Sequence, residues 1–84
     1  MWRNLAEISP QSGYVTCVRF SPDCSKIALC TTTGYVEVRN PTDLSEIASK
    51  QIHSKSVNEI RWSENSELLL SCSDDGKLVL SRYS

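Results

Sequence analysis

The chain has 84 residues, with nine Lys and Arg against ten Asp and Glu, so its formal net charge is −1 and no block of like charge stands out. A chain of this length forms at most one small domain, and its balanced charge argues against a surface for nucleic acid. No apolar run approaches the roughly 20 residues of a membrane span, and no apolar stretch resembling a secretory signal follows Met1. We therefore expect an intracellular protein of the cytoplasm or nucleus, without nucleic-acid or membrane partners.

Short β-branched and aromatic runs alternate with turn-forming residues along the whole chain, a pattern typical of antiparallel sheet. Two turns have clear chemistry, Ser21-Pro22-Asp23 and Asp75-Gly76. In chain order, the expected strands are Leu5–Ser9, Val15–Phe20, Lys26–Cys30, Tyr35–Arg39, Ile47–Ile52, Val57–Trp62, Leu68–Ser73 and Lys77–Arg82.

The four cysteines do not have the spacing of a zinc site. No two of them are separated by only two residues; they are Cys17, Cys24, Cys30 and Cys72. Two disulfides would suit a secreted miniprotein, but without an export signal we expect reduced thiols. The sequence indicates neither a metal nor a cofactor.

An internal repeat organises the chain. Residues 15–40 align without a gap with residues 57–82, so that Arg19 meets Arg61 and Gly34 meets Gly76, a constant offset of 42 residues. A period of about 40–45 residues with strand-like content is the signature of a propeller blade. We divide the chain into a first repeat, residues 1–40, which includes a preceding outer strand, and a second repeat, residues 41–84.

The second repeat has His53 before its first strand, Ser71 in the next strand and Asp75 in the Asp-Gly turn. With these residues at these places the chain resembles the WD-repeat β-propeller family, in which such a histidine, serine and aspartate form a buried hydrogen-bond network with a tryptophan. Ser81-Arg82 stands where the family has Trp-Asp, so the resemblance implies a network of three. The first repeat has none of the four members; Gln11, Leu29, Thr33 and Arg39 occupy those places.

The resemblance implies an all-β fold of two four-stranded antiparallel blades that are part of a propeller. Its phase makes Leu5–Ser9 an outer strand that precedes one complete blade and three strands of the next. Phe20 and Trp62 occupy matching places and are expected in the core. Because sheet edges with unpaired backbone groups would remain at both ends, we do not expect a stable monomer.

The function implied by the resemblance is a non-catalytic scaffold or protein-interaction module. It would contribute two blades to a larger propeller by closure of several copies, as part of a longer WD-repeat protein, or by insertion into a partner's propeller. On the narrow face where partners of the family usually dock, the candidate residues are Tyr14, Thr16, Thr32, Ser56, Asn58 and Asp74.

A hydrolase is the alternative, because Ser71, His53 and Asp75 have the composition of a catalytic triad. The sequence contains no nucleophile elbow and no evident oxyanion donors to accompany them. An exposed Ser71 beside a cleft would favour the hydrolase, whereas a buried and fully hydrogen-bonded Ser71 would favour the structural network.

Overall fold

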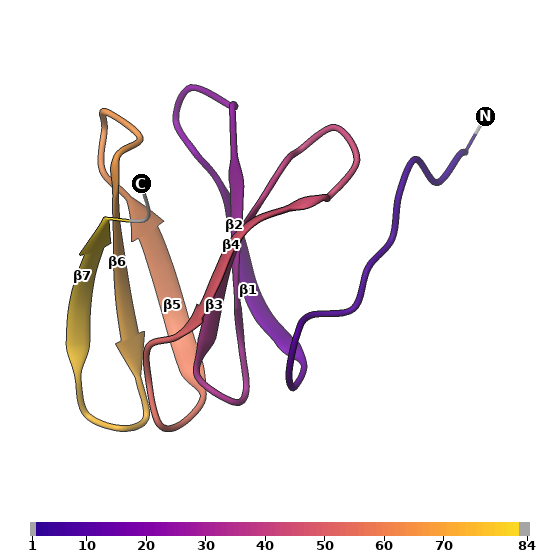
Figure 1. Cartoon of the computed structure of the whole chain (residues 1–84). Coiled ribbons are helices and arrows are strands. Elements are labelled where there is room, and N and C mark those ends of the chain that lie inside the picture. The colour runs from indigo at the N-terminus through magenta and orange to yellow at the C-terminus, as the bar shows by residue number, and fades with distance from the viewer. Residues whose placement is uncertain (1, 83–84) are drawn as a thin grey trace.

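The computed structural model describes residues 2–82, and all of its regular structure is β-strand (Figure 1). The first sheet is four-stranded and antiparallel, in the order β1 (Val15–Phe20), β2 (Ile27–Thr31), β3 (Tyr35–Arg39) and β4 (Glu46–Gln51). The second sheet contains β5 (Val57–Trp62), β6 (Leu68–Ser73) and β7 (Leu78–Arg82). The expected all-β fold is confirmed, and within residues 2–82 no helix could span a membrane.

Each predicted strand except the first is present, with bounds that differ from the expected ones by at most one residue. The prediction of a strand at Leu5–Ser9 is wrong for this structure: residues 2–10 contain no strand and run away from the sheets (Figure 1). A strand exists only when its backbone groups pair with a neighbour. In the described part of the chain no such neighbour pairs with this segment, and Leu5 is 79% exposed.

The core lies between the two sheets, which stack face to face. The first sheet contributes small side chains and the second contributes larger ones; the buried cluster is Ala28, Cys30, Val36, Val38, Val57, Ile60 and Leu69. Side-chain hydrogen bonds cross the interface where β1 meets β5, among them two to backbone carbonyls. The Thr16 hydroxyl donates to the Val57 carbonyl over 2.6 Å, and the Trp62 indole donates to the Arg19 carbonyl over 3.1 Å. Packing and polar contacts therefore join the sheets into one stack.

The two aromatic residues at matching places have different surroundings. Trp62 packs against the core cluster, as expected. The expectation for Phe20 is wrong here, because this side chain is 58% exposed. Phe20 pairs with Ile27 across β1 and β2, whereas their neighbours Arg19 and Ala28 form the adjacent pair. Since successive side chains of a strand point to opposite faces, Phe20 lies on the face turned away from the second sheet.

The β1–β2 turn has the chemistry that its sequence predicts. The Asp23 carboxylate accepts hydrogen bonds from the Ser21 hydroxyl, at 2.7 Å, and from the Ser25 backbone N–H, at 3.0 Å. The Ser21 hydroxyl, followed by the Ser25 donors, holds the pKa of the Asp23 carboxyl well below its usual value. The segment from residue 52 to residue 56 then joins the two sheets, whereas residues 40 and 41, where the repeats are divided, lie between β3 and β4.

Candidate functional site: an open sheet edge and a buried network

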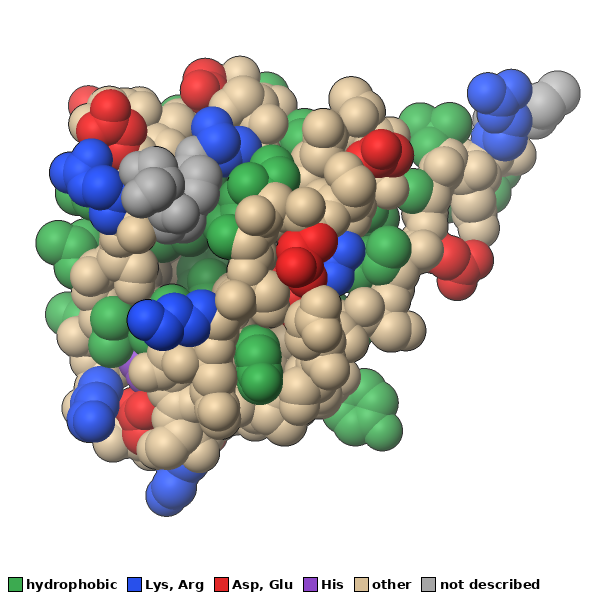
Figure 2. All heavy atoms as spheres, in the orientation of Figure 1, with side chains coloured by type: hydrophobic (Ala, Val, Ile, Leu, Met, Phe, Trp, Pro, Cys, Tyr) green, Lys and Arg blue, Asp and Glu red, His purple; other side chains and the backbone are tan. Residues whose placement is uncertain are grey.

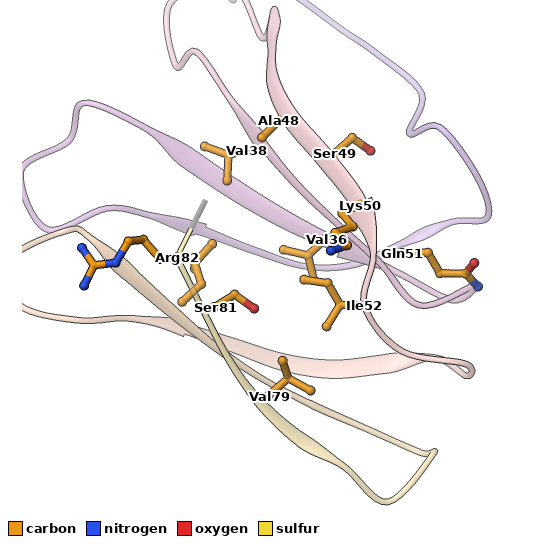
Figure 3. Close-up of a pocket in the computed structure, with 11 residues that line it drawn as sticks. Val36, Val38, Ala48, Ser49, Lys50, Gln51, Ile52, Val79, Ser81 and Arg82 are labelled. Atoms are coloured by element: carbon orange, nitrogen blue, oxygen red, sulfur yellow. The ribbon is translucent and has the colours of Figure 1, made fainter. Parts of the chain in front are cut away.

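Strand β7 is an edge strand of the second sheet and pairs only with β6 in the described chain. Beside it a groove of about 550 Å³ separates β7 from β3 and β4. Figure 3 shows Val36, Ile52 and Val79 pointing toward this space, whereas Gln51 turns away from it. An edge of unpaired backbone groups beside a partly apolar groove is the arrangement that accepts an additional β-strand.

The structure brings His53, Ser71 and Asp75 together. His53 lies in the segment between the sheets, where its Nε2 is 2.9 Å from the Ser71 hydroxyl and its Nδ1 is 3.0 Å from a carboxylate oxygen of Asp75. The same carboxylate accepts backbone N–H groups from Ser54, at 3.0 Å, and Lys77, at 2.9 Å. The network therefore ties the segment before β5 to the turn after β6.

Hydrogen bonding dominates the titration of Asp75. Partial burial acts to raise the pKa of its carboxyl, but the backbone N–H groups of Lys77 and Ser54 and the His53 ring outweigh burial and lower the pKa to about 2. The ionised form is therefore the one that the fold stabilises.

The exposure of Ser71 distinguishes a catalytic triad from a structural hydrogen-bond network. Ser71 is 3% exposed and His53 is 2% exposed, so a substrate carbonyl has no open approach to the hydroxyl. A triad nucleophile requires such an approach together with oxyanion donors. The geometry thus favours the structural network over the hydrolase. Within residues 2–82, no three His, Cys, Asp or Glu side chains are grouped closely enough to hold a metal ion.

The first sheet contains a buried ion pair at the corresponding position, which the sequence analysis missed. Arg39 occupies the tryptophan place of the network; its guanidinium is 2.7 Å from the Glu37 carboxylate, and both side chains are almost inaccessible to solvent. The other oxygen of Glu37 accepts the Gln11 backbone N–H over 2.7 Å. The pair could have been predicted from the spacing, because Glu37 and Arg39 are two residues apart in a strand and therefore lie on the same face.

The six candidate partner-binding residues gather at one end of the stack, where the segments entering β1 and β5 meet the β2–β3 and β6–β7 turns (Figure 1). Tyr14 is 80% exposed, and its backbone N–H donates to the Thr32 hydroxyl over 3.0 Å. Asn58 donates to Asp74 over 2.8 Å. Thr16 bridges the sheets, and Ser56 is half-buried. The end therefore combines a fixed backbone with one prominent aromatic side chain.

The Asp75 network gives stability a defined pH dependence. Because its pKa is lowered to about 2 in the folded chain from about 3.9 in an unfolded chain, its contribution is complete above the unfolded value and is lost as pH falls toward the folded one. We expect the difference in thermal midpoint between the wild type and Asp75→Asn to be largest near neutral pH and to shrink between about pH 5 and pH 2. Thermal unfolding followed by circular dichroism across this range is the measurement. A constant difference would show that the carboxylate does not stabilise the fold through its charge.

Comparison with known proteins agrees with this geometry. The family model "WD domain, G-beta repeat" matches residues 2–38 and 45–80. WD repeat-containing protein 1 of Mus musculus is 31% identical over 71 residues, and that of Xenopus tropicalis is 30% identical. Each alignment covers 81% of this chain and 12% of the relative, so the chain spans about an eighth of the length of these relatives.

Among solved structures, the β-propeller domain of Cps50 (Swd1) from Myceliophteria thermophila superimposes with a TM-score of 0.80 at 27% identity. The superposition covers 89% of this chain and 23% of that one. The two stacked sheets are therefore arranged as sheets are in that β-propeller domain.

Proposed function

The chain belongs to the WD-repeat β-propeller family, and on that basis we propose that it is a non-catalytic scaffold that contributes two blades to a larger propeller and binds proteins. The three-stranded second sheet carries this proposal, because its open β7 edge adjoins a partly apolar groove. The added strand comes from a second copy, from elsewhere in a longer chain, or from a partner's propeller. The proposal places the chain in the cytoplasm or nucleus, where a buried thiol such as that of Cys30 remains reduced.

The loop end supplies the surface for protein partners. Tyr14 stands out of an end whose turns are held by backbone hydrogen bonds, such as the one from the Thr32 N–H to the Tyr14 carbonyl at 2.9 Å. Exposed aromatic side chains provide contact area at a low cost in conformational entropy. This end is therefore the part of the scaffold best suited to hold another protein.

A strand peptide tests whether the β7 edge is open to pairing. We would add a synthetic peptide with the sequence of residues 4–11 to the purified chain and follow backbone amide signals by NMR. Binding should shift the amides of residues 78–82 and slow their hydrogen exchange, because strand addition depends on backbone hydrogen bonds.

The matched control is the same peptide with proline in place of Ala6, which lacks one backbone donor. Two results would contradict strand addition at this edge. One is equal amide shifts with both peptides, and the other is amide shifts in β7 without slower hydrogen exchange.

A further inference from the structure

The second sheet has an apolar face that the first sheet does not cover. Leu78 is 67% exposed, Leu80 65% and Leu70 37%, and we call these three residues the leucine face. Hydrophobic side chains gather at the edge of the molecule that carries β7 (Figure 2). A shallow groove of about 200 Å³ lies on this face; it is lined by Arg61, Trp62, Ser63, Leu68, Leu70 and Leu80. A small protein seldom leaves such a face without a partner.

The first sheet has an uncovered apolar face at the opposite end of the stack. Val18 is 42% exposed and Phe20 is 58% exposed, and we call these two residues of β1 the Phe20 face. They lie on the side of the first sheet that is turned away from the second sheet. One chain thus carries two uncovered apolar faces that point in opposite directions.

The internal repeat relates these two faces to an interface that already exists within the chain. Each residue of the leucine face has an equivalent 42 positions earlier, in the first sheet. These equivalents are buried against the second sheet; they are Ala28, Val36 and Val38. The equivalent of Phe20, 42 positions later, is Trp62, which packs against the core cluster that contains these three residues. The groove on the leucine face is therefore the counterpart of the place where Trp62 packs.

The sizes of the side chains are complementary between the two cases. Within the chain, the large indole of Trp62 packs against a cluster that contains the small Ala28 and Val38. At the corresponding place on the leucine face, Leu70 and Leu80 are larger, and the ring of Phe20 is smaller than an indole. Close packing is preserved when a gain in volume on one side meets a loss on the other.

We propose that the leucine face of one chain binds the Phe20 face of a second copy, with Phe20 in the groove beside Arg61. This inference rests on the proposed function, since it treats the stacking of the two sheets as one step of a larger propeller. The contact is head to tail, so it repeats until the ring closes. Three or four copies would supply six or eight blades, within the range of about four to eight that propellers use.

The position of the N-terminal segment agrees with this arrangement. Residues 2–10 run from the side of the first sheet that carries the Phe20 face (Figure 1). In a second copy docked through that face, this segment is brought to the side of the first copy where β7 has its open edge. The same contact can therefore cover the leucine face and deliver the strand that the edge accepts.

The proposed interface between copies should depend less on salt than the interface between the two sheets of one chain. Within the chain, Arg19 pairs with Glu59 at 3.0 Å. Between copies, the repeat sets Arg61 opposite the uncharged Cys17, so the counterpart of this ion pair is absent. We expect the association constant to change less than about twofold between 0.05 and 0.5 M salt, because screening acts on charges and leaves apolar contacts intact.

Two complementary variants test the proposal. Leu80→Glu disables the leucine face and Phe20→Glu disables the Phe20 face; both side chains are mostly exposed, so each chain should fold. We expect each variant alone to associate at least tenfold more weakly than the wild type. An equimolar mixture should form a dimer of one copy of each, because one intact face of each kind remains. Native mass spectrometry distinguishes these species, and circular dichroism checks the fold.

Thr42→Glu, in the exposed β3–β4 turn, is the control and should associate as the wild type does. If Phe20→Glu does not fold, Phe20→Ser takes its place in the mixture. The proposal is overturned if the mixture stays as single chains, if a variant alone associates like the wild type, or if the wild type does not associate. If the wild type does not associate but still binds the strand peptide, only the second copy is refuted as occupant and the proposed function stands.

Discussion

Arg39→Met should cause one of the largest losses of stability of any single substitution in this chain. The variant keeps most of the volume of the side chain but leaves the Glu37 carboxylate, which is fully buried, without its cation. Removing one partner of a buried ion pair typically costs about 3–5 kcal/mol. Arg39 also donates to the Leu44 carbonyl over 2.8 Å, which helps to hold Leu44 in the left-handed region at φ +63°. Urea unfolding followed by circular dichroism measures the change.

The control is Arg19→Met, which removes the same charge from an ion pair whose two side chains are 41% and 38% exposed. Its effect should be much smaller, because exposed pairs exchange their partner for water at little cost. Replacing both buried charges, in Glu37→Leu with Arg39→Met, should recover a large part of the loss. Similar losses from Arg39→Met and Arg19→Met would show that the Glu37–Arg39 pair is not buried in solution.

Gly34→Ala should be the most damaging of the glycine substitutions. Gly34 has φ +90°, and its carbonyl accepts the backbone N–H groups of Ile52, at 2.9 Å, and His53, at 3.1 Å. A Cβ on Gly34 would collide with the His53 carbonyl. The substitution therefore combines a disfavoured backbone conformation with a clash against the backbone that carries the histidine of the network.

Gly76→Ala is the matched comparison, because Gly76 occupies the equivalent place in the second repeat with φ +82° and has open space around it. Its cost should be that of the left-handed conformation alone, about 1–2 kcal/mol. Gly34→Ala should cost more than this, and it should also weaken the protection of the His53 amide in hydrogen exchange. Equal losses for the two variants would mean that the β2–β3 turn does not press on the His53 segment.

Strand positions were predictable where local chemistry and the repeat agreed. Tyr35–Arg39, Val57–Trp62 and Leu68–Ser73 have the predicted bounds, because turn residues on both sides mark where each strand begins and ends. The grouping of His53, Ser71 and Asp75 also followed from the resemblance, which places a linker residue against a turn.

Features that depend on a neighbouring sheet or strand could not be predicted from local sequence. Leu5–Ser9 has strand-like composition, but a strand needs a partner, and Phe20 is in the core only if another sheet covers its face. The Glu37–Arg39 pair differs from the family's network, so the resemblance gave no indication of it. The pair was predictable only from the alternation of charged and apolar residues in β3, a strand that is buried on both faces.

Sedimentation of the purified wild-type chain measures whether the two stacked sheets bind further sheet at the β7 edge and the leucine face. Between about 1 and 100 µM, we expect an average mass that rises with concentration above that of one chain, because both uncovered faces and the open edge bind further copies. Cooperative thermal unfolding should then shift to higher temperature with concentration. A species with the mass of one chain across this range, with a single concentration-independent unfolding transition, would show that no second copy covers the edge or the two faces.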